Sequence, residues 1–523
     1  MAAPTTAAAE PTTFLRLDTQ AAHYKWLVAS IVLVAGATQT FAGTSVNIII
    51  PRLMSAFGTD LGTTQWVATA FLLTRTLVMP LLGWLGGIMG NRNMFVAMMV
   101  GFVVTSAGCG LATSLPMMIG FRLIQGLVLG SMEGLTTVIL VGAFPASQRG
   151  LALGLRAIGW SAGQVVFYAL GGYLVEELSW RLIFFLGIPS ALIAAVGGWL
   201  ILPQHREYKG EPVDYLGLMA LASFLVPLLL AISFGRDSST ETSTLVLLGC
   251  GALTGGALFV LRELLAPYPV VNLRMFRVPV FRLICATAFL NNLGLFGALF
   301  MVPIFLQQVL GLSPLQAGLV IVPALIVSGF TGVLAGKLSD LFPPPIVVIS
   351  MMMALSVIFF TFSSVTALTS MTVIVGYVIM YRVCMNGSVT PLTVLLVQRL
   401  GTEQVRMAQG LLGVVRSIGS VFGVTATSVF FERRRVLHQL TSYDTYNLSS
   451  PEHHDTLYEL KLFLHQAGIL GSAADLAALG TIRRQMDIEA ITLAFQDSFV
   501  FICTCFLMAS IPMLYLFIRY RKL

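Results

Sequence analysis

The chain of 523 residues is strongly apolar, with 57% hydrophobic residues, only 10% charged residues and a mean hydropathy of +0.88. Soluble domains carry about 25% charged residues, so this composition excludes a water-soluble protein. The net charge of +7 does not indicate nucleic-acid binding, because Lys and Arg occur in short clusters between apolar runs, as the positive-inside rule for membrane proteins requires.

The apolar runs are about 20 residues long, which is the length that spans a bilayer as an α-helix. They do not alternate between apolar and polar residues as the strands of a membrane β-barrel do. Backbone polar groups in lipid must be hydrogen-bonded within their own helix or within a closed barrel. The sequence therefore predicts an all-α membrane protein.

The first 25 residues are rich in Ala and Thr and lack a charged region leading to a cleavage site. This predicts a disordered cytoplasmic tail over residues 1–25 rather than a signal peptide. Apolar stretches bounded by Pro, Gly or charge then predict about fourteen transmembrane helices. They lie near residues 26–50, 64–86, 94–112, 117–142, 150–175, 181–202, 214–234, 243–264, 280–309, 315–340, 345–364, 369–398, 406–431 and 495–519.

The placement of Lys and Arg predicts the orientation of these helices. With the N-terminus in the cytoplasm, most Lys and Arg residues fall in inner loops, and Arg519, Arg521 and Lys522 at the C-terminus lie on the same side. Both termini are therefore predicted to be cytoplasmic.

One long polar segment, residues 432–494, separates the last two predicted spans. We expect an external loop subdomain of short amphipathic helices that caps the external mouth, with an Ala/Leu-rich helix at 467–480. The four His residues of this segment lack the H-x-x-x-H spacing and the Cys neighbours of a metal site, so no metal is predicted.

Two short motifs reveal an internal duplication. Gly83-Trp84-Leu85-Gly86-Gly87, after the second predicted span, resembles Gly336-Lys337-Leu338-Ser339-Asp340, which lies 253 residues later. Transporters built from such parallel repeats form their substrate site between the halves, near the middle of the membrane. We therefore predict two six-helix halves, 26–202 and 280–523, separated by two inserted transmembrane helices within 203–279.

Several further motifs lie in a consistent order at the predicted span boundaries. They are Asn47-x-x-x-Pro51, Arg122-x-x-Gln125-Gly126, Ser179-Trp180-Arg181-x-x-Phe184, Asp214-x-x-Gly217, Gly336-x-Leu338-Ser339-Asp340, Thr390-Pro391-Leu392 and Arg416-x-x-Gly419-x-x-x-Gly423. Together they resemble the fourteen-span drug:proton antiporters of the EmrB/QacA type, in the major facilitator superfamily, over nearly the whole chain.

The resemblance implies the major facilitator fold, a bacterial inner-membrane location, and secondary active export of a small amphipathic molecule by proton antiport with alternating access. It implies no enzymatic activity and no cofactor, and the chain lacks the P-loop pattern of ATP-hydrolysing proteins. The implied partners are membrane lipids, the small amphipathic substrate and, as for some relatives, a periplasmic adaptor protein.

The chain departs from the family pattern where an acid is usual. Ala42 stands where the first helix usually has Asp, Gly87 stands where the first inner loop usually has an acid, and Phe167-Tyr168 replace a usual Gly-Pro pair. These departures leave other functions open. A uniporter or lipid-type flippase without proton coupling is the alternative, and a non-transporting membrane sensor is a more remote one.

The two duplicated motifs are predicted to form conformational latches. Gly83, Gly87 and Gly336 have no Cβ, so two helices and a short inner loop can approach closely there. The carboxylate of Asp340 can accept hydrogen bonds at the N-terminus of a neighbouring helix.

Five ionisable residues lie deep inside predicted spans, where a charge costs at least about 2.5–3.5 kcal/mol and indicates function. They are Arg122, Glu133, Arg156, Arg382 and Arg416. Glu133 is the carboxylate that we place well inside a span, and we predict that it carries the coupled proton. An ion pair between Glu133 and Arg156 is expected because their helices are antiparallel neighbours, and it can either lock these helices together or regulate the proton affinity of Glu133.

The deep arginines are the predicted contacts of the substrate cavity. Four Arg against one Glu favour an anionic or zwitterionic headgroup, because guanidinium pairs well with carboxylate and phosphate. The cavity candidates are Arg122, Arg156, Arg382 and Arg416, with Tyr377, Tyr381, Asn291 and Asn292 as aromatic and polar companions.

Overall fold

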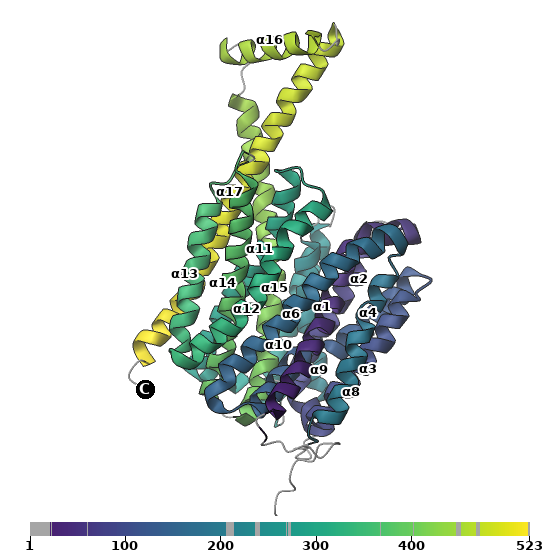
Figure 1. Ribbon diagram of the computed structural model, residues 1–523, viewed down its shortest axis with the longest axis vertical. Coiled ribbons are helices and arrows are strands. Elements are labelled where there is room, and N and C mark those ends of the chain that lie inside the picture. Colours follow the sequence, from purple (N-terminus) through teal and green to yellow (C-terminus); the bar gives the residue numbers. More distant parts are fainter. Residues whose placement is uncertain are drawn as a thin grey trace, which may run out of the picture.

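The computed structural model describes residues 21–520 apart from 22, 60, 205–213, 236–240, 268, 270–272, 367, 401, 446–450 and 467–470. Most of the predicted tail, residues 1–20, therefore lies outside the described part of the chain. The described residues are almost entirely helical and form one bundle, from which a hairpin of two long helices projects (Figure 1). The predicted all-α membrane fold is confirmed.

The first group of helices precedes the residues 205–213. It consists of α1 (Tyr24–Phe57), α2 (Leu61–Val78), η1 (Met79–Leu81), α3 (Leu82–Gly110), α4 (Leu115–Leu129), α5 (Met132–Ala143), η2 (Ala146–Gln148), α6 (Arg149–Tyr173), η3 (Leu174–Leu178), α7 (Leu182–Phe185) and α8 (Ile188–Ile201). Within α3, Gly90 has φ 74° and ψ 156°, a backbone conformation that Gly adopts without strain. Two helical segments meet there, between the predicted spans 64–86 and 94–112.

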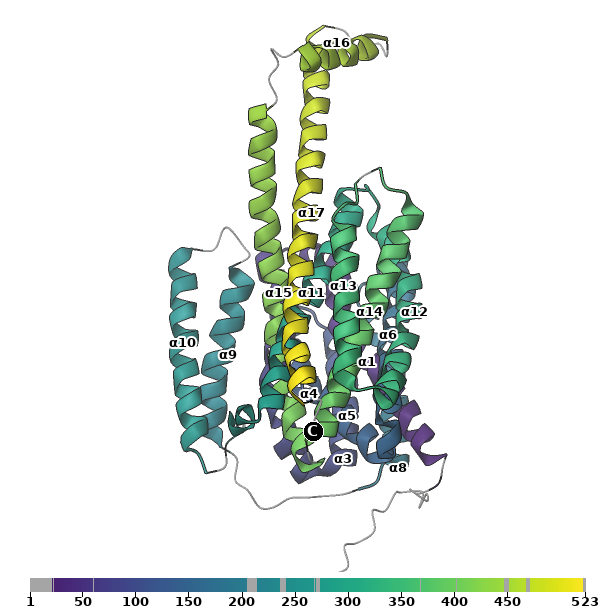
Figure 2. The ribbon, with the colours of Figure 1, turned by 90° about the vertical axis from the view of Figure 1, so that its left-hand side faces the viewer.

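The remaining helices follow residue 213. They are α9 (Tyr215–Phe234), α10 (Thr242–Leu265), η4 (Leu273–Arg277), α11 (Pro279–Gln308), α12 (Pro314–Leu341), α13 (Pro344–Phe362), α14 (Met371–Arg399), α15 (Thr402–Thr445), α16 (Pro451–Gln466) and α17 (Ser472–Tyr520). Helices α9 and α10 pack mainly against each other and stand beside the main bundle, which they contact through α2, α15 and η4 (Figure 2).

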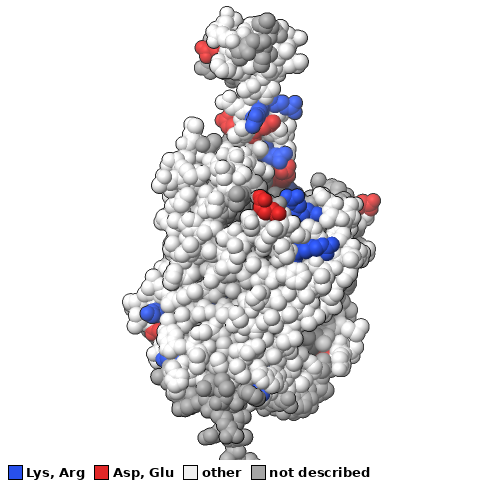
Figure 3. All heavy atoms as spheres, turned by 45° about the vertical axis from the view of Figure 1, so that its right-hand side comes forward, with Lys and Arg blue, Asp and Glu red and all other residues white. Residues whose placement is uncertain are grey.

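Among the described residues, 12 helices are long and apolar enough to cross a membrane. Helix α2 contributes a shorter apolar stretch, Trp66–Leu81, and α6 is not among the twelve although it packs between α1 and α12. The exact number of fourteen spans and the cytoplasmic side of the termini stay predictions, as do the three predicted domain boundaries. In Figure 3, charged atoms gather on the projecting hairpin and at the adjoining end of the bundle, and a broad band below is nearly free of them.

The polar segment 432–494 does not form the short helices that the sequence predicts. Instead α15 continues without interruption to Thr445, α17 already begins at Ser472, and both project away from the bundle with α16 at the tip (Figures 1 and 2). The expected cap over the mouth is therefore wrong. Helicity of the Ala/Leu-rich stretch is confirmed from Ser472 onward, and residues 467–470 lie outside the described part.

Polar contacts between α15 and α17 explain why these helices continue. Asp497 of α17 accepts a hydrogen bond from Arg434 Nε at 2.6 Å, and its carboxylate lies 2.6 Å from His438 Nε2. Farther out, the carboxylate of Asp487 accepts hydrogen bonds from Gln439 Nε2 at 2.8 Å and from the Tyr443 hydroxyl at 3.0 Å. The polar parts of α15 and α17 thus stabilise each other, because most helices in proteins depend on contacts with a neighbouring element.

The closest packing between the two halves lies along α6 and α12. A Cβ on Gly154 of α6 would collide with the carbonyl oxygen of Gly332 on α12, and Gly150 and Gly336 face each other in the same way. Absence of these Cβ atoms lets the two backbones touch, as small residues do in many membrane helix pairs.

We expect Gly154→Ala to lower the melting temperature of the purified protein, because the added methyl group forces α6 and α12 apart at a cost of about 1–3 kcal/mol. Gly120→Ala on α4 is the matched control, since a Cβ there meets nothing within 4 Å. Thermal unfolding in detergent measures both. Equal melting temperatures for the two variants would contradict this role of the α6–α12 contact.

Candidate functional site

Glu133 lies in the first turn of α5, directly after the break between α4 and α5. That break packs against the end of α2: the Ser131 hydroxyl donates a hydrogen bond to the Val78 carbonyl oxygen at 2.9 Å, and a Cβ on Gly130 would collide with the Arg75 carbonyl oxygen. The junction therefore fixes where the Glu133 side chain enters the bundle.

Three guanidinium groups surround the Glu133 carboxylate. Arg156 Nη1 of α6 lies 3.2 Å from Oε1, and Arg416 Nη1 of α15 lies 3.3 Å from the same oxygen. Arg75 Nη2 of α2 lies 3.9 Å from Oε2. The predicted Glu133–Arg156 ion pair is confirmed, whereas the pairing with Arg416 and Arg75 was not foreseen.

Arg75 is absent from the predicted set, although the sequence places this charged residue within the predicted span 64–86. The Arg416 pairing left no such signal, because the two residues are 283 positions apart. We call Glu133, Arg75, Arg156 and Arg416 the Glu133 cluster. Its side chains are 10% to 30% exposed, so the cluster is only partly covered by protein.

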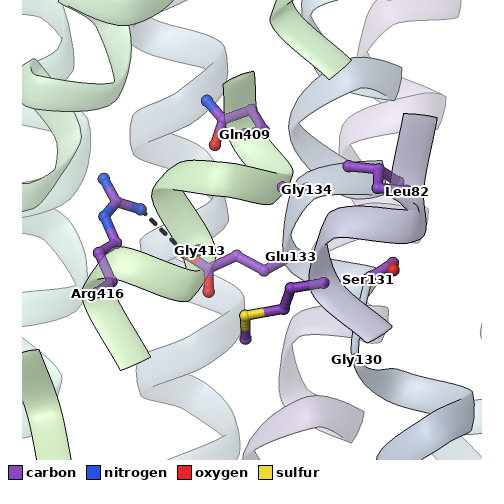
Figure 4. A pocket seen from close by; sticks show the side chains of 10 residues that line it. Leu82, Gly130, Ser131, Glu133, Gly134, Gln409, Gly413 and Arg416 are labelled. Atoms are coloured by element: carbon purple, nitrogen blue, oxygen red, sulfur yellow. Dashed lines mark hydrogen bonds and ion pairs between the residues drawn. The ribbon is translucent and has the colours of Figure 1, made fainter. Parts of the chain in front are cut away.

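The Glu133–Arg416 pair joins the two predicted halves, because α5 belongs to the first and α15 to the second (Figure 4). Arg416 is held further by Thr393 of α14, whose hydroxyl oxygen accepts a hydrogen bond from Nη2 at 2.9 Å. Gly410 of α15 allows the close approach, since a Cβ on it would come within 2.7 Å of the Met79 carbonyl oxygen.

A narrow pocket lies beside this pair. Its lining residues are Met79, Leu82, Gly130, Ser131, Glu133, Gly134, Gln409, Gly410, Gly413 and Arg416 (Figure 4). Within the described part of the chain, Arg416 Nε and Gln409 Nε2 are buried and have no hydrogen-bond acceptor. Buried donors are normally satisfied, so the pocket suits an oxygen atom from water or from a bound molecule.

Arg122 does not join the Glu133 cluster. It is 1% exposed, and its Nη1 donates hydrogen bonds to the Ala42 carbonyl oxygen at 2.8 Å and to Gln125 Oε1 at 3.0 Å. Its guanidinium carbon lies 5.5 Å from the centre of the Phe71 ring and 5.1 Å from that of Phe184. These contacts hold α4 against α1 and α2, beside the position where the family usually has Asp.

Arg382 is also separate from the cluster. It lies eleven residues before Thr393 on α14, a rise of about 16 Å. The side chain is 4% exposed, and its Nε donates a hydrogen bond to the Tyr381 hydroxyl at 3.1 Å. Among the described residues, no carboxylate forms an ion pair with Arg382. Tyr168 of α6 packs against the same cluster of apolar side chains as Tyr381.

The remaining predicted companions pair within the second half. Asn291 Nδ2 donates to the Ser388 hydroxyl at 3.2 Å, and Asn292 Nδ2 donates to the Ala288 carbonyl oxygen at 2.8 Å. Tyr377 stacks on Phe362 with ring centres 5.2 Å apart. Contact of any of these residues with substrate stays a prediction.

The second latch motif makes the contact that the sequence predicts for Asp340. Its carboxylate oxygens accept hydrogen bonds from the backbone N–H groups of Gly150 at 2.8 Å and Leu151 at 3.0 Å, in the first turn of α6. Gly336 lies at the close contact with Gly150. The reason given for Gly87 is wrong, because a Cβ there would meet nothing within 4 Å. Gly83 lies in α3, and its surroundings are outside the described part.

The model of the Major Facilitator Superfamily matches residues 32–424 of the chain. The chain belongs to this superfamily. Members of the major facilitator superfamily are transporters, so the expectation of a multi-pass membrane transport protein is confirmed. Gly150, Gly154, Gly332, Gly336 and Asp340 therefore belong to the contact between the two halves of a major facilitator fold.

Several relatives in this superfamily are named as efflux or resistance proteins. The chain is 26% identical to the multidrug transporter protein MdtP of Bacillus subtilis. The alignment extends over 409 residues and covers 78% of this chain and 75% of MdtP. It is 27% identical to the fatty acid resistance protein FarB of Neisseria gonorrhoeae over 91% of this chain and 92% of FarB. It is also 27% identical to the multidrug export protein EmrB of Haemophilus influenzae, over 77% of this chain and 80% of EmrB. The resemblance to EmrB-type efflux proteins is confirmed.

Two solved structures share the fold. The human organic anion transporter MFSD10 aligns with a TM-score of 0.60 at 15% identity, over 94% of this chain and 99% of that one. The proton:xylose symporter XylE aligns with a TM-score of 0.56 at 16% identity, over 79% of this chain and 90% of that one. At these identities the likeness concerns the fold.

Proposed function

We propose that this protein is a secondary active transporter of the bacterial inner membrane that exports an anionic or zwitterionic amphipathic molecule in exchange for protons. The observation that carries this proposal is the Glu133 cluster, in which one carboxylate binds arginines from both halves. Export is favoured by the relatives named as efflux and resistance proteins.

The coupling follows from charge. With Glu133 ionised, the carboxylate attracts Arg416 toward Arg156 and Arg75, which holds α15 against α5 and η1. Protonation of Glu133 removes this negative charge and leaves three guanidinium groups that repel one another, since arginine stays ionised in proteins. The halves then separate more easily at this level. Proton binding and the alternation of access thus change each other's free energy, as coupling requires.

Two other functions differ from this one in the role of Glu133. In a uniporter or lipid-type flippase, the cluster only holds the helices together and no proton moves with the substrate. Ala42, in place of the usual Asp, is the feature that favours this alternative. In a non-transporting sensor, ligand binding produces no flux at all. Transport driven by a pH gradient identifies the antiporter, and substrate flux without a gradient separates the uniporter or flippase from the sensor.

The substrate class follows from Arg382. A guanidinium group buried within the membrane requires an electrostatic partner, and the described residues offer it the Tyr381 hydroxyl and ring but no carboxylate. An anionic headgroup fits this position. The name of FarB, a fatty acid resistance protein, supports the same class of substrate.

The projecting hairpin is the proposed docking surface for a periplasmic adaptor protein. Its apolar side chains are exposed beyond the bundle, with Val436 44%, Leu437 48% and Leu440 57% exposed on α15 and Phe463 65% exposed on α16. These positions belong to the outer part of α15 and to α16, which project beyond the bundle (Figures 1 and 2). A helical partner protein is the occupant that exposed apolar side chains on projecting helices favour.

Glu133→Gln is expected to abolish export of a fluorescent fatty acid driven by a pH gradient in proteoliposomes, because the amide cannot exchange a proton. Glu177→Gln, at an exposed Glu of η3, is the matched control and keeps export. Melting temperature checks that the variant is folded. Gradient-coupled export by Glu133→Gln at the wild-type rate would refute the proton role of Glu133. Export that does not respond to the gradient, in the wild type and the variant alike, would favour the uniporter or flippase.

Replacing residues 440–485 by a short Gly/Ser linker is expected to abolish resistance to fatty acids in cells while leaving export in proteoliposomes intact. The linker removes Leu440, Phe463 and the outer part of the hairpin but leaves Val436, Leu437 and the bundle in place. Both measurements compare with the full-length chain at equal expression. Undiminished resistance in cells would show that the hairpin is not needed for an adaptor.

Arg382→Gly is expected to weaken binding of a fatty-acid anion about tenfold or more, since one charge-assisted pair contributes about 1.5–3 kcal/mol. The measurement is a titration with the anion and with a quaternary ammonium dye of similar size, and the exposed Arg433→Gly serves as control. Tighter binding of the dye to the wild type, or unchanged anion binding in Arg382→Gly, would show that Arg382 has a structural role instead.

A further inference from the structure

A second cavity shares no residue with the Glu133 cluster and lies where the first turn of α11 meets the last turns of α17. Five residues line it: Pro279, Arg282 and Leu283 from α11, and Tyr515 and Arg519 from α17. It has about 490 Å³ of empty space, part of which is open to the outside. We propose that this cavity binds the phosphate headgroup of an anionic phospholipid in the leaflet at this end of the bundle.

The two guanidinium groups provide the charge for a phosphate. Arg282 and Arg519 come from different helices and line the same cavity, and both are exposed at its surface. Arg519 Nη1 donates a hydrogen bond to the Tyr515 hydroxyl, and its guanidinium carbon lies 5.6 Å from the centre of that ring. Tyr515 thus orients Arg519 within the cavity. Paired guanidinium groups are suited to phosphate because each can donate two hydrogen bonds to it.

The two helices that line the cavity carry no acidic residue near it in sequence. From Leu273 to Gln308, and again from Ser498 to Tyr520, the chain contains neither Asp nor Glu. The helix η4, directly before α11, adds the exposed Arg277. The charged side chains that line the cavity are therefore both positive, and basic cavities between membrane helices are known to attract anionic lipid headgroups.

An apolar stripe beside the cavity distinguishes a lipid from a soluble phosphate. Along α17, Tyr515, Ile511 and Met508 follow at helical spacing and are 45%, 61% and 55% exposed. They lead from the cavity toward the middle of the membrane-spanning helix, and α11 and α17 lie side by side over this stretch (Figure 2). An acyl chain can lie along this stripe while its phosphate is held by Arg282 and Arg519.

This site is independent of the proposed export function. Its residues lie on α11 and α17, neither of which contributes a side chain to the Glu133 cluster. The ligand is also a permanent membrane component rather than cargo. Loss of export in a Glu133 variant therefore leaves the lipid site testable, and the reverse also holds.

The test is native mass spectrometry of the full-length protein in detergent, titrated with dioleoyl phosphatidylglycerol or with dioleoyl phosphatidylcholine. We expect the anionic lipid to bind about tenfold or more tightly than the zwitterionic one, and Arg282→Gln/Arg519→Gln to remove this preference. Arg282→Lys/Arg519→Lys is expected to keep a reduced preference, because the charges remain but the bidentate geometry is lost.

The matched control is Arg433→Gln/Arg435→Gln, which removes two positive charges at the opposite end of the bundle and is expected to keep the preference. Wild-type lipid preference in Arg282→Gln/Arg519→Gln, or equal loss in both double variants, would overturn the proposal. Competition by glycerol phosphate as strong as by the lipid would also overturn it, since it would identify a site for a soluble phosphate. Melting temperatures without added lipid verify that each variant is folded.

Discussion

The free-energy cost of placing an ionised carboxylate in a membrane determines which side chains surround Glu133 at the centre of this protein. An ionised side chain inside a spanning helix is stable only where opposite charges or water compensate for lost solvation. Glu133 meets this requirement through guanidinium groups on α2, α6 and α15, two from its own half and one from the other. The charge of this carboxylate therefore acts at one of the places where the two halves touch.

Close backbone approach is the second condition for this contact. Arg416 can reach Glu133 only because α15 lies against η1, where Gly410 leaves room for the Met79 carbonyl oxygen. The α6–α12 contact has the same origin, with glycines on both sides and the Asp340 carboxylate bound to the first amides of α6. Charge and glycine packing thus act together: the glycines bring the halves close enough for short-range ion pairs to form across them.

Sequence reasoning predicted the features that depend on local order. The Glu133–Arg156 pair could be predicted because a short turn joins α5 and α6 and places the two residues at similar depth. Asp340 could be assigned to a helix N-terminus, but not to that of α6, since the packing of the halves selects the helix. The same packing selects Arg416 as a partner of Glu133 across 283 residues, and no local pattern encodes it. The hairpin was missed because α15 and α17 stabilise each other only after they meet, through residues such as Asp487 and Asp497.

Arg382 and Glu133 both carry a charge inside the membrane, but they have different partners, and this difference matters for coupling. Glu133 has its countercharges within the protein, whereas Arg382 has a phenol as its hydrogen-bond partner among the described residues. The two sites are connected by α14, on which Arg382 and Thr393 lie about 16 Å apart. An anion at Arg382 therefore does not compete directly with the Glu133 carboxylate for Arg416. In the proposed exporter, substrate and proton influence each other through the movement of α14 and α15, because these helices carry both contacts.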